Sequence, residues 1–438
     1  MIKDSIGRYL TSYAHPVSRL LVAPHPTRIY AHVLTIPVFD ESRSFLNRLI
    51  PEDAADLLIV LVVNAPSNRQ DSDPALQRTL ELWWDLQRHL KPDTANPQLC
   101  WGTIDENKNI GILVVDSVSP DWRLPPKAGV GTARKIAADI ALKLIHQGVV
   151  ETPWIHCTDA DVSVPSGYFS ATDCYRHLTA GDLPAACIYP FRHTSDDQNL
   201  SHLATTYELH LRYYSERLHH IGSPYAFHSL GSTLAIASAS YARVRGFPQR
   251  SGAEDFYLLN KLLKTGPIVC LAQPCLPIEA RLSHRVPFGT GPALARLSRT
   301  PEPLSYPLES FQPIEQFHKA LWSLTQVPRH CHSWLPHHPV KAFQEMGMEQ
   351  VGDQLAYHSR SLQRYQRGWL EWFDGFRLVR YLNICRARGM ADQPLLATTR
   401  SLYAKPQALT AELNHLLYLR ETLSPRIHSI GLPMTSIE

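Results

Sequence analysis

The chain has 438 residues, with 43 Lys or Arg against 40 Asp or Glu, so its formal net charge at pH 7 is +3. This near balance argues against a nucleic-acid partner, because nucleic-acid binders usually carry a strongly basic stripe. The length allows two or three domains with a sizeable hydrophobic core.

Export and membrane signals are not evident in the sequence. The N-terminal residues lack the long apolar region of a signal peptide, and the longest apolar run, 57–63, is too short to cross a bilayer. The eight cysteines are scattered and include no Cys-x-x-Cys pair. We therefore expect a cytoplasmic protein with free thiols and no transmembrane segment.

Strand-like and helix-like patterns alternate along the first two thirds of the chain. The run 57–63 is continuously apolar and rich in β-branched residues, which is typical of a parallel strand covered on both faces. The expected strands lie at 29–38, 57–63, 111–116, 154–158, 186–190 and 232–237. The expected helices lie at 40–50, 73–90, 133–146, 200–220 and 254–264. This alternation predicts an α/β fold with a doubly wound sheet.

Composition divides the chain into three parts. Residues 1–28 are predicted to be a polar lead-in, residues 29–291 the α/β domain, and residues 292–438 a mostly helical C-terminal region that begins with a proline-rich linker. The aromatic stretch 369–376 is more typical of a packed helix face than of a ligand platform. The C-terminal helices are one place where a homo-oligomer could form.

Polar residues follow several of the expected strands. Asn64, Asp116 and the pair Asp159 and Asp161 all lie at predicted strand ends. In a doubly wound sheet the carboxyl ends of the strands form the ligand-binding edge. These side chains are therefore expected to converge on one cleft.

Asp159 and Asp161 form an Asp-x-Asp motif. If the chain stays extended through Ala160, both carboxylates project from the same side. Two hard oxygen ligands suit Mg²⁺ or Mn²⁺, which a nucleotide diphosphate can share. The motif alone is a weak signal, since carboxylate pairs are common at strand ends.

Two glycines precede the helix expected at 133–146. Gly129 and Gly131 would let the backbone approach a ligand, and a helix N-terminus favours phosphate. Arg134 and Lys135 could neutralise a diphosphate. The alternative is an ordinary helix entry with Arg134 on the surface.

An acidic pair, Glu254 and Asp255, begins the helix expected at 254–264. Acidic residues at a helix N-terminus often do no more than offset the helix dipole. The functional alternative makes Asp255 a general base that removes a proton from an acceptor hydroxyl.

The glycine-punctuated loop 283–291 combines a histidine and an arginine. His284 is a candidate metal ligand and Arg285 a candidate phosphate contact, although a lone histidine more often has a surface or hydrogen-bonding role.

Together these segments resemble the family 2-type glycosyltransferases with the GT-A fold. The resemblance covers 33–291. It includes the opening strand with Pro37 and a turn in which Asp40 replaces the usual Asn before Glu41, and the second strand with Asn64. It continues through the segment 129–134, the Asp-x-Asp motif, the stretch 231–236 and the catalytic Glu-Asp pair, which matches Glu254 and Asp255.

The resemblance implies a GT-A doubly wound mixed sheet, a UDP- or GDP-linked sugar donor, a hydroxyl acceptor and Mn²⁺ or Mg²⁺. By position, the residues that it implies for donor binding are Pro37, Asp40, Glu41, Asn64, Gly129, Gly131, Arg134, Asp159 and Arg285. It implies Asp159, Asp161 and His284 for the metal, and Asp255 with Glu254 for catalysis. The loop 283–291 also resembles that of synthases that glycosylate glycerate or phosphoglycerate. Some of those retain the anomeric configuration, so the stereochemical outcome stays open.

Three other functions remain open. A haloacid dehalogenase-type phosphatase also uses Asp-x-Asp after an apolar strand, but near the start of its domain. A nucleotidyltransferase would usually carry a glycine-rich loop after the first strand, and 37–44 contains no glycine. A catalytically degenerate domain that only binds or scaffolds is the non-enzymatic alternative.

Overall fold

The computed structural model describes residues 2–21, 28–175, 179, 182–283, 289–300, 302–330, 333–335, 341–403 and 428–432. The chain forms two compact units. The first contains the described residues within 1–197, 229–295 and 425–429, and the second those within 198–228, 296–424 and 430–438. The segment 198–228, which the sequence places inside the α/β domain, thus belongs with the C-terminal helices.

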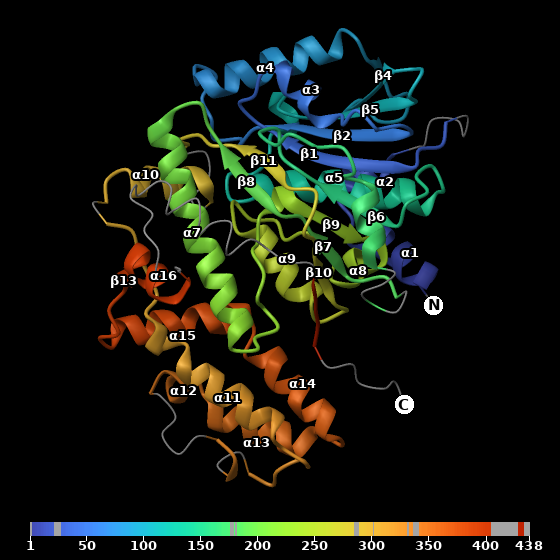
Figure 1. Ribbon diagram of the computed structural model, residues 1–438. Coiled ribbons are helices and arrows are strands. Elements are labelled where there is room, and N and C mark those ends of the chain that lie inside the picture. The colour runs from blue at the N-terminus through green and yellow to red at the C-terminus, as the bar shows by residue number, and fades with distance from the viewer. Residues whose placement is uncertain are drawn as a thin grey trace. The chain divides into compact units, whose positions relative to one another are not determined.

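A ten-stranded mixed sheet forms the centre of the first unit, in the order β14-β10-β7-β9-β6-β1-β2-β5-β4-β3 (Figure 1). The strands are β1 (His32–Val38), β2 (Leu57–Asn64), β3 (Lys91–Pro92), β4 (Leu99–Asp105), β5 (Ile110–Ser117), β6 (Trp154–Cys157), β7 (Ala186–Ile188), β9 (Leu234–Ala237), β10 (Ile268–Cys270) and β14 (His428–Ile430). Strands β6, β1, β2 and β5 are parallel, whereas β9 is antiparallel to both β6 and β7. The predicted α/β fold and the mixed sheet are confirmed.

The core of this sheet follows the apolar pattern of the sequence. All eight residues of β2 are buried, as are all eight of β5, so both faces of these strands are covered. Strand β4 was not predicted, because the second half of it is largely exposed and polar. It pairs antiparallel with β5 near the sheet edge.

Helices and smaller elements complete the first unit. Helix α5 (Gly129–His146) packs on β1 and β2, and α4 (Pro74–Gln87) packs on β2. Short elements lie between the strands: η1 (Arg43–Phe45), α3 (Leu46–Leu49), η2 (Pro120–Trp122), η3 (Ser170–Cys174), β8 (Phe191–Thr194), η4 (Gly231–Thr233), α8 (Ser238–Arg243), α9 (Glu254–Leu262), β11 (Leu276–Glu279) and α10 (Thr290–Leu297). Strands β8 and β11 form a separate parallel pair.

The described part of the N-terminal segment, which the sequence predicts as a polar lead-in, forms two helices. Helices α1 (Ile2–Ser12) and α2 (Pro16–Arg19) both pack against α5, and α1 also packs against α8. Ile6 and Tyr9 of α1 and Val17 of α2 are buried, and Tyr9 anchors α1 through its hydroxyl as well as its ring.

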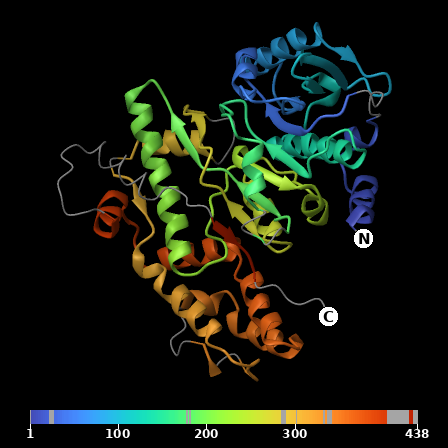
Figure 2. The same ribbon diagram turned by 45° about the vertical axis from the view of Figure 1, so that its right-hand side comes forward.

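The second unit is mainly helical, and its long helix α7 (Gln198–His220) is the green helix in Figure 2. The other elements are η5 (Leu308–Ser310), α11 (Gln312–Trp322), α12 (Lys341–Glu345), α13 (Met348–His358), α14 (Leu362–Trp372), α15 (Gly375–Ala387), α16 (Leu395–Tyr403), β12 (Leu304–Ser305) and β13 (Gln393–Pro394). Trp369 and Phe373 are buried and contact Phe317, so the predicted packed aromatic face is confirmed. Among the helices in the described ranges, none has the length and apolarity of a membrane span.

Candidate active site

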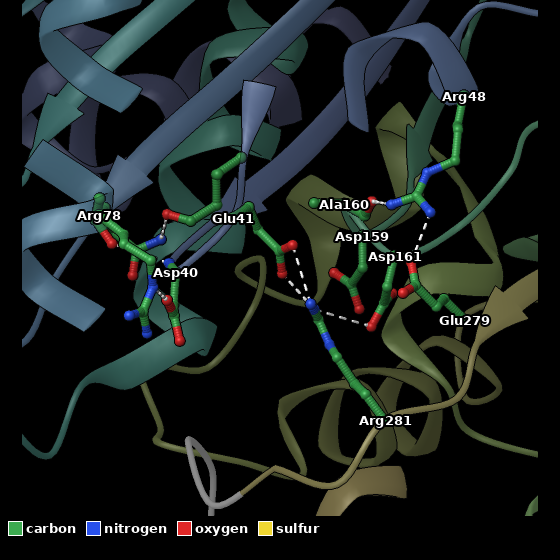
Figure 3. A network of polar contacts seen from close by, with 12 residues as sticks. Asp40, Glu41, Arg48, Arg78, Asp159, Ala160, Asp161, Glu279 and Arg281 are labelled. Carbon is green, nitrogen blue, oxygen red and sulfur yellow. Dashed lines mark hydrogen bonds and ion pairs between the residues drawn. The ribbon is translucent and has the colours of Figure 1, made fainter. Parts of the chain in front are cut away.

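The Asp-x-Asp motif lies directly after β6, beside the carboxyl end of β1. Thr158 N donates to Thr35 O of β1 at 3.1 Å, which fixes the chain just before the motif. The two carboxylates then take different partners. Asp159 pairs with Arg134, and Asp161 pairs with Arg281 (Figure 3). The side chains are 32% and 22% exposed, so both acids reach the surface of the first unit.

Arg134 of α5 is the buried centre of the site. Its Nη2 lies 2.8 Å from Asp159 Oδ1, its Nε donates to Glu254 Oε1 at 2.9 Å, and its Nη1 donates to Gly231 O at 3.1 Å. Burial opposes the charge, but Asp159 and Glu254 outweigh it and raise the pKa of Arg134 further. The guanidinium therefore joins the Asp-x-Asp motif to the Glu-Asp pair, 95 residues apart in sequence.

The backbone at Gly231 leaves no space for a side chain. A Cβ at this position would lie 2.6 Å from the Cζ and the Nη2 of Arg134. Gly231 precedes β9 in the stretch that the resemblance had singled out, and its carbonyl accepts one of the Arg134 hydrogen bonds. A larger residue here would have to displace the guanidinium, which Asp159, Glu254 and the Gly231 carbonyl hold in place.

Asp255 lies in the first turn of α9, next to Glu254. Phe256 N donates to Asp255 Oδ1 at 2.7 Å, and the backbone of Gly231 also hydrogen-bonds the carboxylate. Burial and the charge of Glu254 raise the pKa of Asp255 to about 7, although Arg134 and the two backbone donors oppose the shift. A carboxyl group with this pKa is suited to accept a proton near neutral pH.

Glu254 does more than offset a helix dipole. Its side chain is 5% exposed and points inward to Arg134. Its charge is one of the two causes that raise the pKa of Asp255. It therefore acts on the neighbouring acid and on the central arginine.

The two glycines at the start of α5 pack against protein backbone. The helix begins at Gly129 itself, so both glycines lie in its first turn. A Cβ at Gly131 would lie 2.5 Å from Pro248 O, and one at Gly129 would lie 2.5 Å from Ser251 Cα. In this structure the close approach that glycine allows is to the loop before α9.

The end of β1 and the turn that follows it carry three residues of the predicted donor site. Pro37 lies within β1, and Asp40 follows with a left-handed φ of 60°. Asp40 Oδ1 accepts from Arg78 Nε at 2.7 Å, and Glu41 binds Arg281 through both carboxylate oxygens (Figure 3). This turn thus brings Glu41 to the side of Asp161.

Asn64 ends β2 in a buried position. Its amide donates to Val38 O at 3.0 Å and to Val62 O at 3.1 Å, so its nitrogen ties the ends of β1 and β2 together. The two hydrogen bonds of the Asn64 amide nitrogen are therefore explained by the pairing of the strands.

Two arginines that the sequence did not single out lie beside the motif. Arg281 follows β11 and contacts Glu41 and Asp161, while Arg48 of α3 lies 2.6 Å from Glu279 Oε2 and donates to Ala160 O at 3.3 Å. The sequence carried a hint of them: an acidic and a basic residue, Glu279 and Arg281, alternate directly before the loop 283–291.

A divalent cation fits part of this donor set. Within the described residues, no three His, Cys, Asp or Glu side chains are grouped closely enough to hold an ion. Mg²⁺ and similar ions commonly use one or two carboxylates and take other ligands from phosphates and water. The buried Nε atoms of Arg48 and Arg281 have no hydrogen-bond partner, which suits an anionic ligand nearby. His284 and Arg285 lie outside the described residues.

No protein-family model and no curated protein matches the chain. The chain is similar to two solved glycosyltransferase structures. S. aureus TarS 1–349, solved in complex with UDP-GlcNAc, is 11% identical with a TM-score of 0.34, and the match covers 77% of this chain and 90% of that one. The mannosyltransferase PcManGT from Pyrobaculum calidifontis, solved with GDP-Man and Mn²⁺, is 15% identical with a TM-score of 0.31, covering 97% and 96%. Likeness at this level does not decide what the chain does.

Proposed function

We propose that the protein is a metal-dependent glycosyltransferase that moves a sugar from a nucleotide-diphosphate donor to an acceptor hydroxyl. The observation that carries the proposal is the bridge made by Arg134 between Asp159 and Glu254. It ties the Asp-x-Asp motif, whose carboxylates have cation-binding chemistry, to the Glu-Asp pair, in which the pKa of Asp255 is raised to about 7. Transfer from a metal-bound diphosphate needs both kinds of group.

The acidic motif would hold the cation. Asp159 and Asp161 are the proposed ligands, with the remaining positions left to the donor diphosphate and to water. The cation, when bound, would stabilise the negative charge that develops on the leaving diphosphate. Arg281, at the same edge, would add positive charge close to that position.

Asp255 would act as the general base. In its ionised form it would accept the proton of the acceptor hydroxyl while the oxygen attacks the anomeric carbon. The hydrogen bonds from Phe256 N and the backbone of Gly231 fix the direction of its carboxylate, and the charge of Arg134 favours its ionised form. This role corresponds to an inverting reaction, and the product stereochemistry tests it.

The first experiment is calorimetric titration with UDP, GDP, ADP and CDP and their sugar conjugates, each with and without Mn²⁺. We expect one nucleotide to bind tightly only with the metal, and the binding to weaken at least about tenfold in Asp161→Ala, which removes a carboxylate ligand. Asp85→Ala is the matched control, because Asp85 is an exposed acid paired with Arg43. Equal binding by wild type and Asp161→Ala would contradict the proposal.

A catalytically degenerate binding module gives a different result. It would bind a nucleotide sugar with Mn²⁺ but release no nucleoside diphosphate with any acceptor hydroxyl. Product release measured over a panel of acceptors, including glycerate and phosphoglycerate, separates the two functions.

A further inference from the structure

The guanidinium of Arg281 binds two carboxylates from distant parts of the chain. Its Nη1 donates to Glu41 Oε2 at 3.0 Å, and its Nη2 contacts Glu41 Oε1 and lies 3.3 Å from Asp161 Oδ2 (Figure 3). Glu41 follows β1, Asp161 follows β6 and Arg281 follows β11. One positive group therefore lies between two acids at the ligand-binding edge of the sheet.

The two acids need a positive charge between them. The Glu41 side chain is 9% exposed and that of Asp161 is 22% exposed, so solvent screens their repulsion only in part. Burial opposes the charge of Arg281, but Glu41 and Asp161 outweigh it and raise its pKa. Arg281 consequently stays charged and neutralises the pair.

We propose that Glu41 and Asp161 are a cation-binding pair, and that Arg281 is the internal counter-ion that a divalent cation displaces from them. The inference rests on the proposed function, which supplies the cation, and extends it by adding Glu41 as a ligand and Arg281 as a competitor. It predicts that the affinity for Mn²⁺ in the nucleotide-free protein is limited by the ion pair with Arg281.

Geometry favours displacement over joint binding. A divalent ion held by both acids needs their oxygens at about 2 Å, and Nη2 of Arg281 already fills the space between those oxygens. Two positive charges in that space would also repel each other. The Nε of Arg281 is buried without a hydrogen-bond partner, so the arginine leaves this position without losing a bond at that atom.

The experiment measures Mn²⁺ binding to the full chain without nucleotide, by electron paramagnetic resonance of free Mn²⁺. Arg281→Met removes the competing charge, and we expect the Kd for Mn²⁺ to fall at least about tenfold. Arg43→Met is the matched control, because it removes the same charge from an exposed ion pair with Asp85, an acid outside the proposed site. We expect it to change the Kd less than about threefold.

A second set of variants tests the role of Glu41 as a ligand. Glu41→Gln should weaken Mn²⁺ binding although it lies outside the Asp-x-Asp motif, and most of the gain from Arg281→Met should disappear in the double variant. Thermal unfolding verifies that each variant folds. If Arg281→Met does not fold, Arg281→Gln keeps polar donors, removes the charge and should show the same gain.

Two outcomes separate the inference from the proposed function. Equal Kd values for wild type and Arg281→Met, with Mn²⁺-dependent nucleotide binding intact, would overturn the inference and leave the proposed function standing. Absence of Mn²⁺-dependent nucleotide binding in the wild type would overturn the proposed function and the inference with it.

Discussion

Helix α5 presents two neighbouring basic residues to two different buried networks. Arg134 joins Asp159 and Glu254, and one member of this network, Asp159, is 32% exposed. Lys135 lies 3.1 Å from Asp139, which is completely buried. Both networks hold buried charges in the same helix, but only the first reaches solvent where a ligand can bind.

The Asp139 network is closed by protein groups. Asp139 accepts hydrogen bonds from the hydroxyls of Tyr9 and Tyr241 at 2.6 and 2.8 Å, and from His15 N at 2.7 Å. It holds α1 and α8 against α5. The comparison separates two kinds of buried charge. One has only protein partners, and we expect it to stabilise the scaffold; the other ends at an exposed acid, which we propose as part of a ligand site.

The largest expected effect concerns the exposed network. Asp255→Asn removes the proposed base but keeps its size, so we expect turnover to fall about 10²–10⁴-fold. Nucleotide-sugar affinity should change little, because the base contacts the acceptor. Steady-state kinetics and calorimetry on the same preparation measure the two quantities, and undiminished turnover would refute the assignment.

A change in the closed Asp139 network should lower the stability of the protein rather than its turnover. Asp139→Ala leaves the buried Lys135 without its partner, so we expect the free energy of unfolding to fall by about 3–5 kcal/mol. Denaturant unfolding measures it, with Asp85→Ala as the exposed control. Comparable stability of the two variants would show that the Asp139 network does not hold the scaffold.

Between these two cases lies a change in backbone packing. Gly231→Ala places a Cβ against the Arg134 guanidinium, which must move and take Asp159 and Glu254 with it. We expect turnover to fall about 10–100-fold, since small misplacements in a catalytic site are costly. Gly7→Ala is the control, because a Cβ there meets no atom within 4 Å. Unchanged turnover in Gly231→Ala would separate the Arg134 bridge from catalysis.

The smallest expected effect is the pH dependence of activity and stability. Burial and Glu254 raise the pKa of Asp255 to about 7, so kcat/KM should fall about tenfold per pH unit below 7 and level off above it. The folded state also binds this proton more tightly than the unfolded state. The free energy of unfolding of the protein should therefore decline as pH rises from about 4 to about 7.

The pH dependences of activity and of stability should change together in one variant. Asp255→Asn should remove this part of the decline in stability and also flatten the pH profile of the residual activity. A profile that keeps its slope in the variant would assign the titration to another group.

Local sequence patterns determined much of the secondary structure of the first unit. The apolar runs that become β1, β2, β5 and β6 are each buried by the sheet, and the periodicity of a run reports burial along its own element. The Asp-x-Asp motif and the Glu-Asp pair were visible for the same reason, since each is a short pattern at the end or start of one element. The helices within residues 2–21 were not predicted, since only the packing of α1 on α5 and α8 reveals Ile6 and Tyr9 as a buried face.

Only the tertiary structure decided which charges meet. Arg281 and Glu41 are 240 residues apart, and Arg134 and Glu254 are 120 apart. No periodicity links them, since their contact depends on how β1, β6, β11 and α9 are brought together. The sequence by itself therefore determined the central strands of the sheet and the acids that follow them. Packing decided that an arginine separates Glu41 from Asp161, because charge pairing over such distances exists only after the strands have assembled.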